Sequence, residues 1–103
     1  MKCMVRWQVS VEAGKAIEAR AGGPAPVMGR VMERFKPECV YMSPIKRELF
    51  MVCELSTQDM TEMMIIGSNL AGAYPEIIPV ITGQEFGGVV GKAMPAAHKI
   101  LEG

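Results

Sequence analysis

The sequence predicts an α+β domain in which four strands and two main helices follow one another in the order βαββαβ. Apolar residues alternate with a period of two in the runs 3–10 and 47–55, and they recur at helical spacing in the runs 24–36 and 56–72. Because each βαβ crossover is right-handed, the strands are expected to form one antiparallel sheet in the order 4-1-3-2. Both main helices then cover the same face of that sheet, which makes a two-layer sandwich.

The first element is predicted to be a strand at Cys3–Ser10 that places Trp7 on one face and Arg6 on the other. A short helix at Val11–Arg20 follows and ends in a glycine-rich turn. The first main helix is expected to begin near Pro24–Pro26, because proline suits the first turn of a helix, and to end before Pro37.

The second half of the pattern begins with strands at Cys39–Met42 and Arg47–Leu55, separated by a turn at Ser43-Pro44. Ser56 or Thr57 is expected to cap the second main helix. Three methionines of that helix share one side, where a core stripe is a better interpretation than a copper site: Met60, Met63 and Met64.

The last strand is predicted at Glu76–Ile81, so residues 1–82 form one domain and residues 83–103 form a helical C-terminal tail. Apolar residues recur at helical spacing in the tail, and Pro95 is expected to break or restart that helix.

The two central strands also carry apolar residues on the face away from the helices, especially Phe50 and Val52, or Met51 and Cys53 if the strand faces the other way. An apolar sheet face exposed to water is unfavourable by about 25 cal/mol per Å². A second copy of the chain that covers this face is the simplest remedy, so the sequence predicts a homodimer formed through the open sheet face.

Composition excludes several classes of protein. The 103 residues carry 11 basic and 11 acidic side chains, so no basic field favours a nucleic-acid or membrane partner. The three cysteines form no CxxC pair and favour a reducing, cytoplasmic location. Arg6 and Gln8 interrupt any apolar stretch near the start of the sequence, so no signal peptide is expected. With one histidine and separated cysteines we expect no metal site and no cofactor.

The opening MKCMV, the junction RELFMVCELSTQDMTEMM and the final PEIIPVI are similar to short uncharacterised proteins of the dimeric α/β-barrel superfamily, whose fold is ferredoxin-like. The similarity spans roughly residues 1–82. It implies a homodimer whose two sheets face each other. The superfamily includes cofactor-free monooxygenases, isomerases, haem-degrading enzymes and ligand-sensing domains, none of whose catalytic signatures maps cleanly onto this chain.

Four residues are weak candidates for ligand binding in a cleft between sheet and helices. Arg6 and Glu54, on neighbouring central strands, either form an ion pair or leave Arg6 to bind an anion. Tyr41 could donate a hydrogen bond or a proton, and Trp7 could stack on a planar ligand. His98 has no neighbour suited to orient it and is expected to be exposed.

Three functions stay open on the sequence. The first is a homodimeric protein that binds a small apolar or planar molecule, because its interior is rich in methionine and poor in polar groups. The second is a cofactor-free monooxygenase or isomerase, which rests on the resemblance together with Arg6, Trp7 and Tyr41. The third is a structural or interaction dimer whose tail binds a partner through Phe86 and its apolar neighbours.

Overall fold

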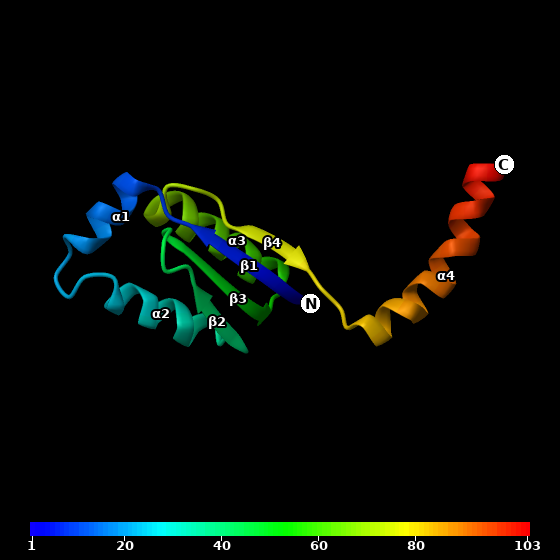
Figure 1. The fold of residues 1–103 in the computed structure, drawn as a ribbon, viewed down its shortest axis with the longest axis horizontal. Helices are drawn as coiled ribbons and strands as arrows, with labels where there is room; N and C mark the ends of the chain where they lie inside the picture. The colour runs from blue at the N-terminus through cyan, green and yellow to red at the C-terminus, as the bar shows by residue number, and fades with distance from the viewer.

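The computed structural model describes residues 1–103 and confirms an α+β domain with a four-stranded antiparallel sheet. Helices cover one face of the sheet, and a last helix extends away from it (Figure 1). The elements in chain order are β1 (Lys2–Gln8), α1 (Val11–Glu18), α2 (Ala25–Phe35), β2 (Cys39–Met42), β3 (Glu48–Glu54), α3 (Thr57–Ile66), the π-helical turn η1 (Gly67–Ala71), β4 (Glu76–Pro79) and α4 (Gly83–Glu102).

The strands lie in the order β2-β3-β1-β4, which is β4-β1-β3-β2 when counted from the other edge. The central strands β1 and β3 pair along their whole length, with Cys3 opposite Cys53 and Trp7 opposite Leu49. Side chains alternate between the two faces of a strand, so this register places the apolar residues of both strands on the same side.

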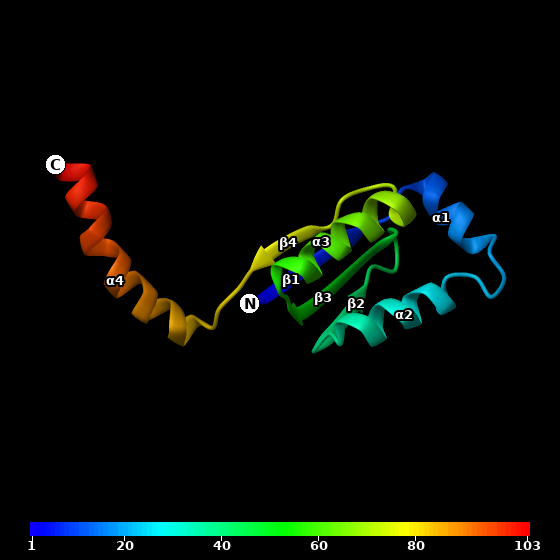
Figure 2. The ribbon, with the colours of Figure 1, turned by 180° about the vertical axis from the view of Figure 1, so that it is seen from behind.

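The hydrophobic core lies between this side of the sheet and the helices (Figure 2). Its eight buried members come from β1, β3, α2, α3 and the residue after β3: Cys3, Val5, Trp7, Phe35, Met51, Cys53, Leu55 and Met63. Met63 is fully buried and Met60 packs against the core, which agrees with the core stripe expected of these methionines.

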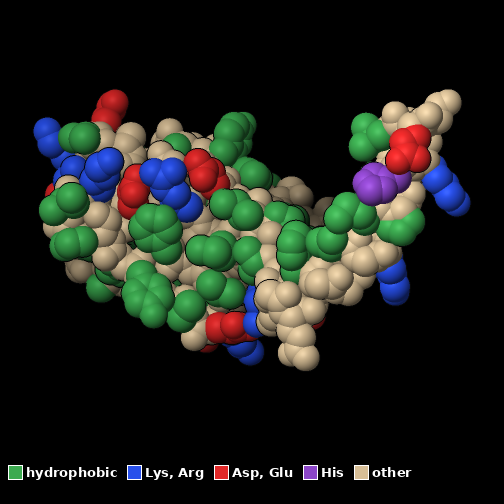
Figure 3. Space-filling view, turned by 45° about the vertical axis from the view of Figure 1, so that its right-hand side comes forward, with side chains coloured by type: hydrophobic (Ala, Val, Ile, Leu, Met, Phe, Trp, Pro, Cys, Tyr) green, Lys and Arg blue, Asp and Glu red, His purple; other side chains and the backbone are tan.

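The opposite face of the sheet carries no helix and is called the open face here. A row of apolar side chains crosses all four strands in register: Ile78, Met4, Val52 and Cys39. The next row contains Arg6 between Glu76 and Phe50, and Tyr41 lies beyond Phe50 on β2. Hydrophobic side chains form a broad cluster over this part of the molecule in Figure 3.

The final helix differs from the sequence-based expectation at Pro95. We expected a break there, whereas α4 continues through the proline to Glu102. Proline removes one backbone donor and crowds the preceding turn, which costs a helix interior about 3 kcal/mol. None of the helices, α4 included, combines the length and the apolar character needed to cross a bilayer.

The start of α3 supports a prediction on acid stability. Ser56 is the N-cap, and the Asp59 carboxylate accepts its backbone N–H at 2.9 Å and a bond from Arg34 of α2 at 2.8 Å. These bonds lower the pKa of Asp59 below 3.8, with the Ser56 bond the larger cause. A lowered folded-state pKa stabilises the fold above the unfolded pKa, and this contribution is lost as the pH falls through the folded value.

We therefore expect Asp59→Asn to reduce stability at pH 6 but to lose less additional stability than the wild type between pH 4 and pH 2. Urea unfolding at each pH measures the difference. Glu33→Gln, which changes an exposed carboxylate of α2, is the matched control and should follow the wild type. If Asp59→Asn loses as much stability as the wild type between pH 4 and pH 2, the Asp59 carboxylate does not contribute to the acid dependence of stability.

Candidate functional site

A mostly apolar cavity of about 270 Å³ lies between the helix-covered side of the sheet and the helices α1, α2 and α3 with its π-turn. Trp7 and Leu49 contribute to it from the sheet. The apolar lining from the helices includes Ile17 of α1, Val27, Met28, Val31 and Met32 of α2, and Leu70 of η1. The cavity is where the sequence analysis expected a cleft, between sheet and helices.

The cavity exists because α2 is held at only one of its ends. Phe35, the last residue of α2, is the only residue of that helix that is buried. At the other end, Gly22 and Gly23 have φ values of 81° and 66°, which favour glycine, and Pro24 precedes the helix. This turn directs the start of α2 away from the end of the sheet (Figure 1). The cavity lies beneath this part of α2, where Val27, Met28 and Val31 line it.

Its size suits a small ring compound. An engineered cavity of about 150 Å³ in another protein binds benzene, and typical ligand pockets have about 300–1,000 Å³. A volume of 270 Å³ lies between these values. The cavity therefore has room for a molecule of one or two rings, and the methionine side chains on its wall can adapt to the ligand shape.

Trp7 is the one polar feature in the apolar wall. Its side chain is 6% exposed, and its indole Nε1 is the only buried side-chain nitrogen or oxygen of the chain without a hydrogen-bond partner. A buried donor without an acceptor costs about 1–3 kcal/mol. A ligand that brings an acceptor to this nitrogen would remove that cost.

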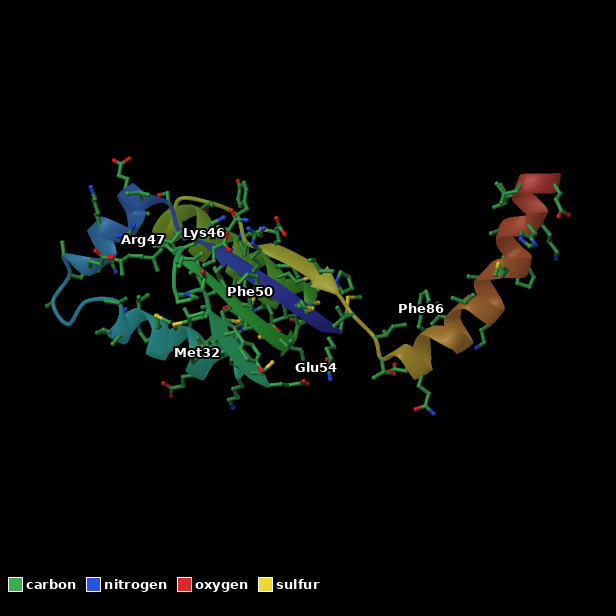
Figure 4. The ribbon with its side chains drawn as sticks, viewed as in Figure 1. Met32, Lys46, Arg47, Phe50, Glu54 and Phe86 are labelled. Atoms are coloured by element: carbon green, nitrogen blue, oxygen red, sulfur yellow. The ribbon has the colours of Figure 1, made fainter.

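The mouth of the cavity is charged. Arg47 donates to Glu18 of α1 at 2.9 Å, and the arginine side chain crosses α1 at Gly14. A Cβ at position 14 would collide with the outer part of the Arg47 side chain, so a larger residue there would displace this arginine from α1. Lys46 also lines the mouth, and no carboxylate lies within ion-pair distance of its ammonium group (Figure 4).

The second carboxylate at the mouth belongs to Glu48, the first residue of β3. It accepts a bond of 2.7 Å from Arg6, which also donates to Glu76 at 3.4 Å. The hydrogen bond that Arg6 donates to Glu48 is the main cause that raises the pKa of Arg6. Since both carboxylates at the mouth are held by arginines, Lys46 is the cation left free to meet an anionic group.

Only one of the four predicted ligand-binding residues lines this cavity. Trp7 does, whereas Arg6, Tyr41 and Glu54 lie on the open face or its edge. The predicted Arg6–Glu54 ion pair was wrong, because Glu54 is opposite Lys2, four residues from Arg6, and pairs with the N-terminal amine at 3.1 Å. Which face of the sheet a charged residue occupies, and which residue lies opposite it, depend on strand register. The alternation pattern does not determine either for charged residues.

Sequence reasoning did not single out Lys46, Arg47 or Gly14. Both basic residues lie just before β3, where charged residues are common and carry no signal of their own. A glycine inside a predicted helix is a usable signal, because it costs about 1 kcal/mol relative to alanine and so indicates a close contact. His98 is exposed on α4, as expected.

The cysteines take no part in the cavity. Cys3 and Cys53 are fully buried in the core, and burial raises the pKa of Cys53 to about 11. Cys39 is exposed at the edge of the open face. The chain holds no cluster of three or more histidine, cysteine, aspartate or glutamate side chains arranged to bind a metal ion.

Comparison of the chain with models of protein families, with characterised proteins and with solved structures found no match.

Proposed function

We propose that this protein is a homodimer that binds a small, planar, mostly apolar molecule in the cavity between sheet and helices. The observation that carries the proposal is a mostly apolar cavity whose lining includes Trp7, the residue with the one buried side-chain N–H that lacks a partner. Binding sites usually combine an apolar lining with a few polar groups that fix the orientation of the ligand.

The polar groups suggest the class of ligand. Trp7 would donate to an acceptor such as a carbonyl or hydroxyl oxygen on the ring, and Lys46 would meet an acidic group at the mouth. An aromatic carboxylate of one or two rings that also carries a ring hydroxyl has both features. Binding is favoured over catalysis because Arg6 and Tyr41, the residues considered for an oxygenase or isomerase, lie on the other side of the sheet.

The lone tryptophan makes the first test direct. A ¹⁵N-labelled sample gives one indole resonance, since the chain has a single tryptophan. Titration with 6-hydroxy-2-naphthoate, which carries both an acidic group and a ring hydroxyl, should shift that resonance downfield if the hydroxyl oxygen reaches Nε1. An indole signal that stays unchanged up to millimolar ligand would contradict the proposal.

A cavity-filling variant gives the second test. Val31→Phe adds a ring to the α2 wall, and we expect it to weaken 6-hydroxy-2-naphthoate binding at least about tenfold, which corresponds to 1.4 kcal/mol. Ala16→Phe adds a ring to an exposed position of α1 that does not line the cavity, and its affinity should equal that of the wild type. Equal affinity in both variants would place the ligand elsewhere.

The role of Lys46 can be tested with ligand pairs. We expect 6-hydroxy-2-naphthoate to bind about two- to fivefold more tightly than 2-naphthol, since exposed ion pairs contribute up to about 1 kcal/mol. Lys46→Gln should remove that difference, whereas Lys15→Gln on the exposed side of α1 should preserve it.

The homodimer is proposed from the open face, where exposed and half-exposed apolar side chains cross all four strands. A second copy that covers this face would bury it and leave the cavity accessible on the other side. Sedimentation at micromolar concentration should give twice the mass of 11.2 kDa, and a monomer would refute this part of the proposal. The free thiols, including exposed Cys39, favour a reducing compartment such as the cytoplasm.

A further inference from the structure

The helix α4 makes no extensive contact with the rest of its own chain. It begins after a short connection from β4 and extends away from the domain, so that the molecule measures 60 Å along its longest axis (Figures 1 and 2). No residue of α4 is buried. Its large apolar side chains are exposed to between 52% and 83%: Phe86, Val89, Met94, Ile100 and Leu101.

The sequence of α4 divides the helix into two sides. Phe86, Val90, Ala93, Ala97 and Ile100 follow one another at alternating spacings of four and three residues, which places them on one side. The residues that flank this stripe on both sides are also apolar or glycine: Gly83, Gly87, Val89, Met94, Ala96 and Leu101. All charged residues lie on the remaining side: Glu85, Lys92, Lys99 and Glu102.

An apolar side of this width is suited to a broad surface. A two-helix coiled coil buries a narrow stripe and usually carries charged residues beside it, whereas α4 has none there. A helix that lies on a sheet buries a wider side. The pattern therefore favours a flat apolar surface as the partner of α4.

The helix also needs such a partner to be stable. Three internal glycines, Gly87, Gly88 and Gly91, each cost about 1 kcal/mol relative to alanine, and Pro95 costs about 3 kcal/mol. Most helices in proteins are stabilised by packing of an apolar side rather than by the helix propensity of their residues. Burial of the apolar side is the available compensation.

The open face offers the matching surface. Its apolar row of Ile78, Met4, Val52 and Cys39 carries no charge, and Phe50 extends it. The nearby Arg6 is already paired with Glu48 and Glu76 of the same chain. The open face therefore presents uncharged side chains to the uncharged side of α4, and its remaining charges need no partner from another molecule.

We propose that α4 of each protomer lies with its apolar side on the open sheet face of a second copy, so that two copies exchange their C-terminal helices. This inference rests on the proposed homodimer and specifies what covers the open face. A helix of 20 residues is about 30 Å long and about 10 Å wide. Two reciprocal contacts of this size bury on the order of 1,200 Å², which reaches the range of stable interfaces.

Site-directed cross-linking of the full chain tests the arrangement. Ala93→Cys places a thiol on the apolar side of α4, and Lys92→Cys places one on the polar side next to it. The natural Cys39 on the open face is the target, because Cys3 and Cys53 are fully buried. A short bismaleimide is added to mixtures of ¹⁴N- and ¹⁵N-labelled protein, and mass spectrometry identifies the linked peptides.

We expect mixed-label cross-links between position 93 and Cys39, at least about fivefold more abundant than those from position 92. Cross-links within one chain would overturn the exchange, because α4 would then fold back onto its own sheet. Two other results would overturn the helix exchange but leave the homodimer in place. One is a cross-link between two copies of position 93. The other is a sample that sediments as a dimer but gives no cross-link from position 93 to Cys39. A monomer in sedimentation would overturn both proposals.

A second pair of variants measures the contribution of α4 to assembly. Phe86→Asp places a charge on the apolar side of α4, and Lys92→Asp places the same residue on its polar side (Figure 4). The dimer dissociation constant should rise at least about tenfold in the first variant and less than about twofold in the second. Equal constants in the two variants would refute a role for the apolar side of α4.

Discussion

Replacing Met63 by alanine is expected to destabilise the protein by about 2–5 kcal/mol. Met63 is fully buried, and it is the one residue of α3 that reaches the core cluster without any exposure to water. The change removes a buried methylene group, the thioether sulfur and the terminal methyl group, and it leaves a void in the core. Since the free energy of unfolding of small domains is only about 5–15 kcal/mol, this single change removes a large part of the stability.

The matched control for this prediction lies two residues further along the same helix. Ile65 is 57% exposed, and Ile65→Ala should change the free energy of unfolding by less than about 0.5 kcal/mol. Both variants are compared by urea unfolding at one protein concentration, because assembly makes stability depend on concentration. A Met63→Ala protein as stable as Ile65→Ala would show that the core does not include α3.

Replacing Gly67 by alanine is expected to cost about 1–3 kcal/mol. Gly67 is buried at the junction of α3 and η1, where an added Cβ would lie 2.6 Å from the backbone oxygen of Ala73 and 2.7 Å from the Pro75 ring. Neither neighbour is a flexible side-chain end, so the chain between η1 and β4 has to move. Its backbone φ of −60° is ordinary, and the requirement for glycine is therefore one of space.

The same replacement of glycine by alanine at position 29 should increase the free energy of unfolding instead of lowering it. Gly29 lies inside α2, is exposed, and has nothing within 4 Å of an added Cβ. Alanine there should stabilise the protein by about 0.5–1 kcal/mol, because alanine loses less backbone entropy than glycine in a helix. Thermal unfolding of the two variants side by side measures both signs. If Gly67→Ala is as stable as Gly29→Ala, the close approach at η1 is refuted.

Local patterns were sufficient to predict where the elements lie. The alternation in β1 and β3 and the helical spacing in α2 and α3 predicted strand and helix positions to within a few residues. Ser56, one of the two residues proposed to cap α3, is its N-cap. These predictions succeed because periodicity and capping depend on near neighbours in the sequence. Pro95 was predicted wrongly, since a proline lowers helix stability without always ending the helix.

The sequence predicted the general location of the candidate site and one of its residues, Trp7. The sequence placed Arg6, Tyr41 and Glu54 in the cleft because they are polar residues near central strands, and the structure places them on the opposite face. Arg47 and Glu18, 29 positions apart, meet at the cavity mouth only because α1 turns back over the end of β3. Contacts of this kind depend on how elements pack and leave no local pattern.

The sequence by itself determined the class of fold, the limits of most elements and the apolar character of both sheet faces, because each follows from short-range periodicity. Only the tertiary structure decided the strand register, the ion pairs of Arg6, the cavity under α2 and the isolation of α4. The physical reason is that register, cavities and unpaired surfaces are set by contacts between distant segments. Those contacts form only when the packing of the whole chain fixes one arrangement among several that satisfy the same local pattern.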